Sequence, residues 1–302
     1  MTRTKLLALA AITVLAAAGC GAHEGSQGSA GVKKVVTTTN VWGSVATAVA
    51  GQHADVKPIM TSPLDDPHSY EASPADAAAI ADAALVVYNG GGYDHWADDV
   101  LKNHPNVATV DAYSLLPHSA PGEANEHVFY NMAVAKAVAS KIADNLASSD
   151  PANADAYRAN AAEFGKQTDT IAAGERAIGQ KHPGAAVVAT EPVAHYLLAA
   201  AGVTDSTPHG FAAAAEDGHD PSPADLAAVL DLINGHHIDA LVVNKQTETA
   251  VTRQLQTTAQ KASVPVVEVT ETLPAGQDYL TWQRQTADAL AHQLDSAPTP
   301  AR

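Results

Sequence analysis

The amino-acid sequence predicts an α/β protein of two lobes, each built on a parallel sheet, with one long rigid helix joining the lobes. Short apolar or β-branched runs alternate with helical patterns along most of the chain, and this alternation is typical of βαβ units. Apolar side chains recur at helical spacing from Tyr157 to Ile178. Counted from the helix start at Asp150-Pro151, this stripe implies a helix of about 30 residues and roughly 45 Å. A helix of this length inside an α/β chain predicts a rigid connector between two lobes.

Residues 1–19 have the pattern of a secretory signal peptide. Arg3 and Lys5 form its basic start, and the apolar run from Leu6 to Ala18 is shorter than the roughly 20 residues that a membrane span needs. Small residues then directly precede Cys20, as in a bacterial lipobox. This resemblance predicts that Cys20 becomes the acylated N-terminus of an exported protein. The alternative is an unpaired cysteine in a discarded peptide.

The expected N-terminal lobe, residues 33–148, follows a Gly- and Ser-rich segment, 20–32, that predicts a flexible tether. One of its helices begins at Ser73, because serine is a good N-cap, Pro74 suits the first helical position and Asp76 adds negative charge to the first turn. The expected strands are 32–39, 55–60, 84–88 and 107–111, and the expected helices are 42–50, 74–83, 93–103 and 127–146.

The expected connecting helix, residues 149–181, begins at Asp150-Pro151, an N-cap followed by proline. The C-terminal lobe, residues 182–295, contains Ser222-Pro223-Ala224-Asp225, which repeats the helix start at 73–76 letter for letter. The repeat agrees with two halves built alike, although four residues of capping chemistry recur easily. The expected strands are 185–190, 240–244 and 264–270, the expected helices are 192–201, 225–234, 249–263 and 279–294, and the Pro-rich tail 296–302 is expected to be disordered.

The composition of the chain excludes some functions. Its 17 Lys and Arg against 33 Asp and Glu give a net charge of −16, so the chain lacks the basic footprint that nucleic-acid binding needs. A single cysteine excludes an intrachain disulfide framework and a cysteine-based zinc cluster, whereas 14 histidines leave other metal sites open. The chain has no HExxH, GxSxG or phosphate-loop spacing, and it is therefore not expected to be an enzyme.

Four side chains follow strands or stiff loops, where ligands bind in open parallel sheets. His68 directly follows Pro67, whose fixed φ stiffens the loop that presents the imidazole. His127 follows a polar loop, Glu191 directly follows the strand expected at 185–190, and Glu271 directly follows the strand expected at 264–270. These positions predict a site in a cleft between the lobes.

Taken singly, each of these residues also has an ordinary structural explanation. His68 is compatible with a solvent-exposed loop histidine, and His127 with a histidine that packs against aromatic neighbours at a helix start. A carboxylate such as Glu191 is stabilised at a helix N-terminus by about 0.3–1 kcal/mol. Glu268 and Asp278 lie close to Glu271 in the sequence, and the local pattern does not choose among the three.

Two histidines and two carboxylates together suit a divalent transition metal. Imidazole binds several first-row ions, and carboxylate oxygens shift the preference towards manganese or iron(II). An all-oxygen set would instead indicate calcium or magnesium. A hydrolytic zinc site is a further alternative, and it would need an open coordination position and a general base.

The chain resembles a known family over most of its length, from about Val35 to Leu294. The segments that carry the resemblance occur in the family's order: DPHSYEASPAD (66–76), VVYNGGGYDHW (86–96), EHVFYN (126–131), ATEPVAHYLLAAAGV (189–203), DPSPADLAAV (220–229) and DYLTW (278–282). The chain is similar in these segments to the cluster A-I substrate-binding proteins of zinc and manganese ABC importers. The resemblance implies two Rossmann-like lobes, one long connecting helix and a metal ion between the lobes.

The resemblance also implies the ligands. The family's two ligand histidines match His68 and His127, and its third ligand, often glutamate in manganese proteins, matches Glu191. The fourth ligand is usually aspartate and matches Glu271, whose longer side chain departs from the family pattern. Zinc proteins of the family often carry a His-rich loop before the second ligand, whereas this chain has only His118 there.

The sequence therefore predicts a lipid-anchored, monomeric component of an ABC importer on the outer face of a bacterial cell membrane. We expect it to bind manganese ahead of zinc, with iron(II) third, and to deliver the ion to a permease and its ATPase. Two alternatives come from other classes. They are a surface adhesin or interaction lipoprotein with a structural metal, and a metal-dependent hydrolase.

Overall fold

The computed structural model describes residues 32–62, 67–117, 125–216 and 218–297. Several predictions concern residues outside these ranges. They are the signal peptide 1–19, the acylated Cys20, the tether up to residue 31, His118, and the tail from residue 298 onwards. No helix in the described ranges is both long and apolar enough to cross a bilayer.

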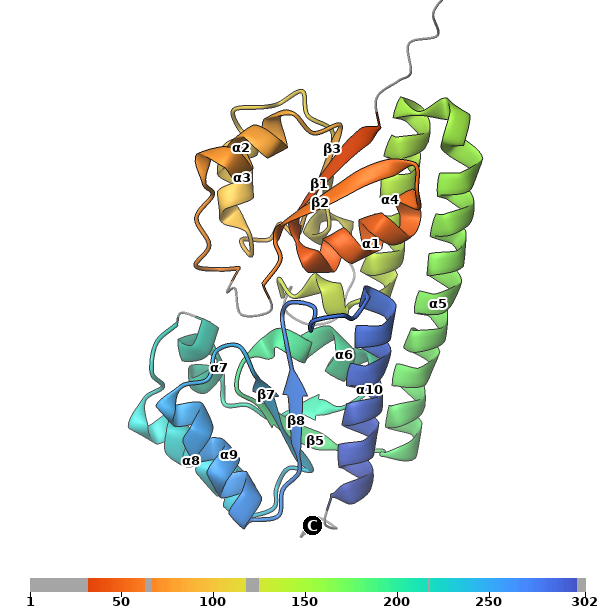
Figure 1. Ribbon diagram of the computed structural model, residues 1–302. Coiled ribbons are helices and arrows are strands. Elements are labelled where there is room, and N and C mark those ends of the chain that lie inside the picture. Colours follow the sequence, from red (N-terminus) through yellow and green to blue (C-terminus); the bar gives the residue numbers. More distant parts are fainter. Residues whose placement is uncertain (1–31, 63–66, 118–124, 217, 298–302) are drawn as a thin grey trace, which may run out of the picture. The chain divides into compact units, whose positions relative to one another are not determined.

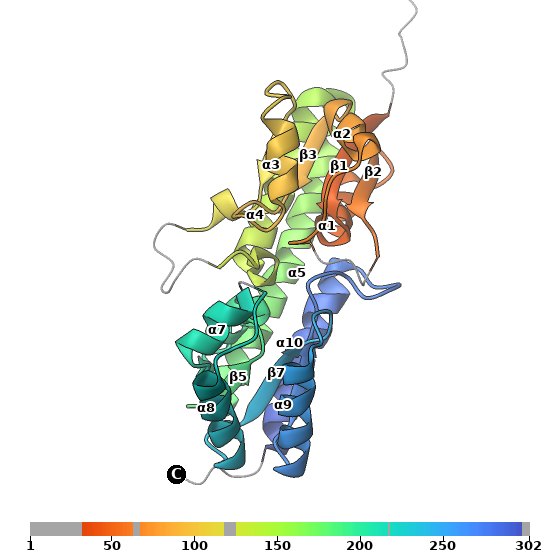
Figure 2. The same cartoon turned by 90° about the vertical axis from the view of Figure 1, so that its left-hand side faces the viewer.

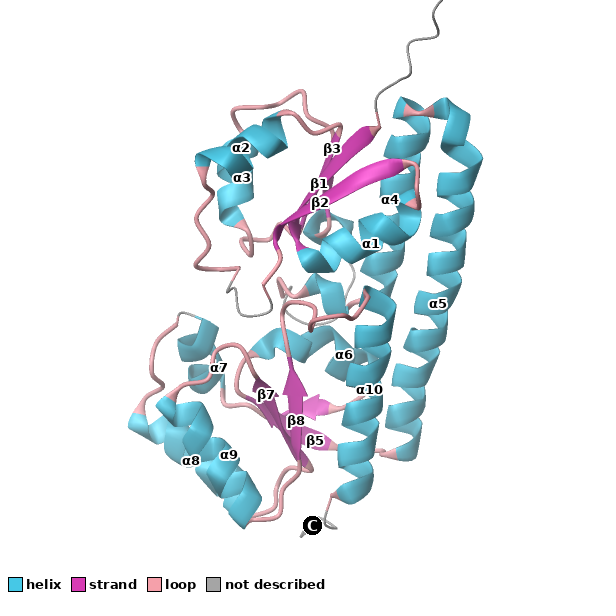
Figure 3. Ribbon diagram, in the orientation of Figure 1, coloured by secondary structure: helices cyan, strands magenta, loops and turns pink. Residues whose placement is uncertain are grey.

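The N-terminal half of the described chain forms a four-stranded parallel sheet. Its strands lie in the order β2 (Ala54–Met60), β1 (Lys33–Thr39), β3 (Leu85–Tyr88) and β4 (Thr109–Asp111). Successive side chains of a strand point to opposite faces, so Val35 and Val36 lie in two different apolar clusters. Val35 packs with α1 (Asn40–Ala50) and α4 (Met132–Ser149), and Val36 with α2 (Pro74–Ala81) and α3 (His95–Leu101). The sheet is therefore covered on both faces (Figure 3).

The C-terminal half repeats this architecture. Its parallel sheet has the order β6 (Thr204–Asp205), β5 (Ala186–Ala189), β7 (Ala240–Asn244) and β8 (Val266–Val269). One face packs against α7 (His209–Glu216), α8 (Pro223–Asn234) and α9 (Ala250–Lys261), and the other against α6 (His195–Ala200) and α10 (Tyr279–Ser296). The sequence pattern missed β6, because its two residues are both exposed, and α7, because only Phe211 in it is buried.

One long helix, α5 (Ala154–Lys181), runs beside both halves (Figures 1 and 2). It contacts α1 and α4 near one sheet and α6 and α10 near the other. A single apolar cluster extends from β1 through α5 to α10, so the helix is packed along both halves. The predicted fold class, two α/β lobes with parallel sheets and a long connecting helix, is confirmed. The helix itself starts later than Asp150, because Pro151–Asn153 form a 3-10 turn before it.

The predicted helix over 127–146 is wrong at its start. Val128–Tyr130 form a 3-10 turn, and the backbone is extended at Asn131. The Asn131 side chain accepts hydrogen bonds from the backbone N–H groups of Ala133 and Val134, and thus caps α4. His127 therefore precedes the helix on an irregular segment and does not belong to it.

Candidate metal centre

The loop after β3 supports the two histidines. Asn89, at the end of β3, is fully buried and donates from Nδ2 to the backbone carbonyl of Glu126 at 2.8 Å. Tyr93 in the same loop packs edge-on against both imidazoles, with ring centroids 4.8 Å from His68 and 5.7 Å from His127. The histidine rings themselves lie 5.9 Å apart. The structure thus brings together two residues that are far apart in the sequence.

The His127 ring is held with one nitrogen free to face the site. The side chain is buried, and Nδ1 lies 2.9 Å from Oδ1 of Asn125. That oxygen also accepts the backbone N–H of His127 at 2.9 Å, which identifies it as an acceptor. Nδ1 therefore carries the hydrogen, and the lone pair lies on Nε2, the arrangement found in metal-binding histidines.

Glu271 is the buried carboxylate between the two imidazoles. Its Oε2 lies 3.3 Å from Nε2 of His68 and 3.6 Å from Nε2 of His127. This oxygen is buried and has no hydrogen-bond donor among the described residues, whereas Oε1 accepts from Nδ2 of Asn244 at 2.7 Å. Burial opposes ionisation of Glu271, but when the imidazoles of His127 and His68 are protonated they outweigh burial and hold the pKa of this carboxyl well below its usual range.

Glu191 follows β5 in an extended conformation and is only partly buried. Oε2 accepts from Nδ2 of Asn244 at 2.6 Å, and Oε1 accepts from the hydroxyl of Thr247. Burial raises the pKa of Glu191, and the hydrogen bonds from these two neighbours oppose the rise. The same cavity, of about 210 Å³, is lined by all four predicted ligands, His68, His127, Glu191 and Glu271.

The two carboxylates that compete with Glu271 lie elsewhere. Glu268 is largely exposed and pairs with Lys245, with Nζ and Oε2 2.7 Å apart. Asp278 is the N-cap of α10 and accepts the backbone N–H of Thr281 at 2.8 Å. Neither side chain lines the cavity that contains the histidines.

Glu126 is a residue at this site that the sequence pattern missed. Its Oε1 lies 3.9 Å from Nδ1 of His68, and Glu126, His68 and His127 can each offer a ligand atom within 4.8 Å of the others. The side chain is 28% exposed, whereas Glu271 is buried on the opposite, Nε2 side of the His68 ring. The only signal in the sequence was its position directly before His127.

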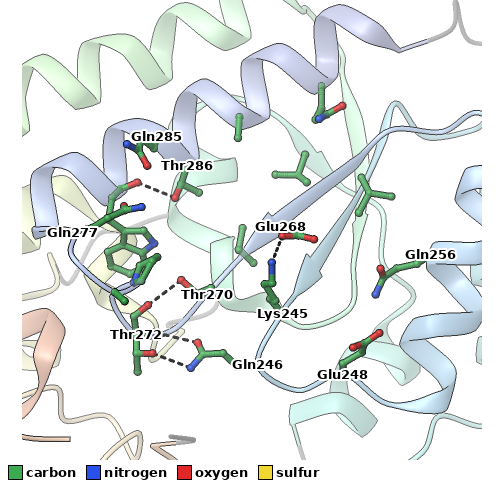
Figure 4. A pocket seen from close by; sticks show the side chains of 18 of the residues that line it. Lys245, Gln246, Glu248, Gln256, Glu268, Thr270, Thr272, Gln277, Gln285 and Thr286 are labelled. Carbon is green, nitrogen blue, oxygen red and sulfur yellow. Dashed lines mark hydrogen bonds and ion pairs between the residues drawn. The ribbon is translucent and has the colours of Figure 1, made fainter. Parts of the chain in front are cut away.

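The loop that carries Glu271 is held from several directions. Gln246 accepts the backbone N–H groups of Glu271 and Thr272 and donates to the Thr272 hydroxyl at 2.9 Å (Figure 4). From the N-terminal half, Tyr93 donates to the carbonyl of Glu271 and Tyr130 donates to the carbonyl of Thr270. The wide groove in Figure 4, of about 1120 Å³, lies beside this loop and is lined by none of the four predicted ligands.

The fold and the site define a class: a two-lobed α/β binding protein with imidazole and carboxylate groups gathered where ligands bind to parallel sheets. The sequence comparisons identify the family. Residues 35–293 match the family described as the periplasmic component A of zinc-uptake complexes, and the chain belongs to this family of metal-binding substrate-binding proteins of ABC transporters.

The relatives agree with this membership. The manganese-binding lipoprotein MntA of Halalkalibacterium halodurans is 30% identical over 158 residues, which are 51% of this chain and 52% of that protein. The manganese ABC transporter substrate-binding lipoprotein PsaA of Streptococcus pneumoniae is 22% identical over 313 residues, covering 96% of this chain and 98% of that one.

A solved structure has the same fold. The laminin-binding protein Lmb of Streptococcus agalactiae, described as a bifunctional protein with adhesin and metal transporting activity, superposes with a TM-score of 0.74. The match has 24% sequence identity and covers 87% of this chain and 99% of Lmb.

Proposed function

We propose that this protein captures a divalent transition metal ion with His68, His127, Glu191 and Glu271 and delivers it to an ABC permease and its ATPase. One observation carries the proposal. The Oε2 atom of Glu271 is buried without a hydrogen-bond donor among the described residues, and it faces the Nε2 atoms of both histidines. A buried carboxylate oxygen without a partner is costly, and a cation held jointly with the two imidazoles would satisfy it.

The charges of the donor set suit a divalent ion. Two ionised carboxylates offset the charge of a divalent cation, and two neutral imidazoles add none, so the occupied site would be electrically neutral. The hydrogen-bonded Nδ1 of His127 leaves Nε2 available for the ion, and Oε2 of Glu271 already faces this nitrogen. Both features support metal binding without a large rearrangement of these side chains.

Manganese is the proposed cargo ahead of zinc, with iron(II) third. Two carboxylates beside two imidazoles favour harder ions than an all-histidine set would, and two relatives carry manganese in their names. Zinc is nevertheless expected to bind tightly in vitro, because it stands above manganese in the Irving–Williams order. Ions recovered from the cell envelope are therefore more informative than affinities alone.

The proposed organisation follows from the same function. Residues 1–19 would direct export, Cys20 would carry the lipid anchor, and residues 20–32 would tether a monomer to the outer face of the cell membrane. The proposed lobes, 33–148 and 182–295, would hold the ion between them, with 149–181 as the connecting helix. The relatives named above as lipoproteins support this location.

An adhesin is the second candidate function, because Lmb is described as having adhesin activity as well. An adhesin with a structural metal predicts an ion that cannot be removed without unfolding the protein. A transport protein predicts that a chelator removes the ion reversibly while both lobes stay folded. Circular dichroism before and after chelation and reloading distinguishes the two. A hydrolase is the remote alternative, and it would require a metal-bound water next to a general base.

The deciding experiment is elemental analysis of the protein purified from its own cell envelope, with His68→Ala as the test variant. We expect the wild type to retain one transition metal and His68→Ala to lose most of it. The matched control is His292→Ala, which removes an exposed histidine of α10 and should retain the metal. Full occupancy of the same metal in His68→Ala would show that the site assignment is wrong.

A further inference from the structure

Asn244 connects the two carboxylates of the site. It is the last residue of β7, which lies between β5 and β8 in the sheet, and it is 1% exposed. Its Nδ2 lies 2.6 Å from Oε2 of Glu191 and 2.7 Å from Oε1 of Glu271. An amide NH₂ group has two hydrogens, so one amide donates to both carboxylates at once.

The orientation of this amide is fixed by the backbone. Oδ1 of Asn244 accepts the N–H of Gln246 at 3.1 Å, which identifies it as the oxygen and leaves Nδ2 for the two carboxylates. The backbone N–H of Asn244 in turn donates to the Thr190 hydroxyl at 3.1 Å. The side-chain amide is therefore held through its oxygen by Gln246 and through Nδ2 by the two carboxylates, and the residue is anchored through its backbone by Thr190.

The Asn244 amide donates to one oxygen of each glutamate and leaves the other oxygen of each glutamate without an amide contact. Oε1 of Glu271 and Oε2 of Glu191 are engaged by the planar amide. Oε2 of Glu271 is left to face the two histidines. Oε1 of Glu191 accepts from the hydroxyl of Thr247, which rotates about a single bond. Each glutamate thus keeps one oxygen that the amide does not occupy.

We propose that Asn244 is a positioning residue that ties Glu191 to Glu271 and limits each carboxylate to one oxygen for the ion. This inference rests on the proposed function, because it takes both glutamates as ligands. Two imidazole nitrogens and two single oxygens make a four-ligand set, which suits tetrahedral zinc. Manganese prefers more oxygen ligands in an octahedral arrangement. Two carboxylate ligands favour manganese over zinc. By limiting each carboxylate to one oxygen, Asn244 makes this preference for manganese smaller.

The test replaces Asn244 and measures both the coordination of the ion and its selectivity. Metal-free wild-type protein, Asn244→Ala and Asn244→Ser are titrated with Co²⁺, whose visible absorption is intense at four-coordinate sites and weak at six-coordinate sites. Dissociation constants for Mn²⁺ and Zn²⁺ are measured by competition with a chelator. Asn103→Ala, which removes an exposed asparagine that follows α3, is the matched control.

We expect Asn244→Ala to weaken the Co²⁺ absorption. We also expect it to raise the affinity for Mn²⁺ relative to Zn²⁺ by on the order of tenfold, the size of effect found for other residues that orient metal ligands. Asn244→Ser has a hydroxyl that can donate to only one carboxylate, so its Co²⁺ absorption and its Mn²⁺ to Zn²⁺ affinity ratio should lie between those of Asn244→Ala and the wild type. If Asn244→Ala does not fold, Asn244→Ser serves as the test variant. An unchanged spectrum with an unchanged Mn²⁺ to Zn²⁺ ratio would overturn the inference, even if both affinities fall. A separate variant, Glu271→Gln, tests the proposed function: wild-type binding of all three ions would refute the ligand assignment itself.

Discussion

Glu175 is a buried carboxylate whose removal should stabilise the protein at alkaline pH. It lies on α5, is 1% exposed, and its Oε1 has no hydrogen-bond partner among the described residues. Burial raises its pKa from 4.5 to about 7, and the neighbouring Arg176 offsets only part of the rise. The folded protein therefore holds a proton on Glu175 at pH values where the unfolded chain has released it.

The sign of the pH dependence follows from this difference. Between about pH 4.5 and pH 7 the folded state binds more protons at Glu175 than the unfolded state, so stability falls as pH rises through this window. One pKa unit corresponds to about 1.4 kcal/mol, so the ionised carboxylate costs about 3 kcal/mol above pH 7. Glu175→Gln has nearly the same shape and no charge. We expect it to raise the free energy of unfolding by about 3 kcal/mol at pH 8.5 and to change it little at pH 4.

The assay is urea denaturation of the metal-free protein, followed by far-ultraviolet circular dichroism at both pH values, because bound metal would add its own stabilisation. The control is Glu163→Gln, an exposed position on the same helix whose Oε2 lies 3.2 Å from Nζ of Lys166. A surface pair of this kind should contribute less than about 1 kcal/mol at either pH. If Glu175→Gln and the wild type showed the same pH dependence, the reasoning would be refuted.

Three further predictions concern the site and its support. Metal affinity should fall as pH drops from about 8 to about 5, since protons compete with the ion for the imidazole nitrogens of His68 and His127. A titration that is flat over this range would count against both ligands. Asn125→Ala should weaken metal binding by on the order of 10- to 100-fold, because its oxygen orients the His127 ring, and equal affinity in a chelator competition would contradict this role. Gly90→Ala should destabilise the protein by more than about 2 kcal/mol, because Gly90 has φ +72° and a Cβ there would lie 2.2 Å from Oδ1 of Asp111. An unchanged urea midpoint would contradict this expectation.

Local chemistry was sufficient for most of the fold. The predicted strand at 240–244 coincides with β7, because a continuous apolar run between turns needs no knowledge of its neighbours to be assigned. The start of α2 was also predictable, since Ser73 and Asp76 form a capping box within one turn. Even the burial of Glu175 was implicit in the sequence. It lies four residues after Ile171 and three before Ile178, on the same apolar stripe of α5.

The sequence by itself determined most of the strands and helices, though not β6 or α7, together with the long connecting helix and the types of side chain that a metal site would need. Only the tertiary structure decided which of those side chains meet. Glu268, Glu271 and Asp278 look alike in the sequence, yet Glu271 alone among them faces the histidines. The bridge from Asn244 to both glutamates joins residues that lie 53 and 27 positions apart. Local patterns depend on neighbours along the chain, whereas such contacts depend on how sheets and loops pack in space.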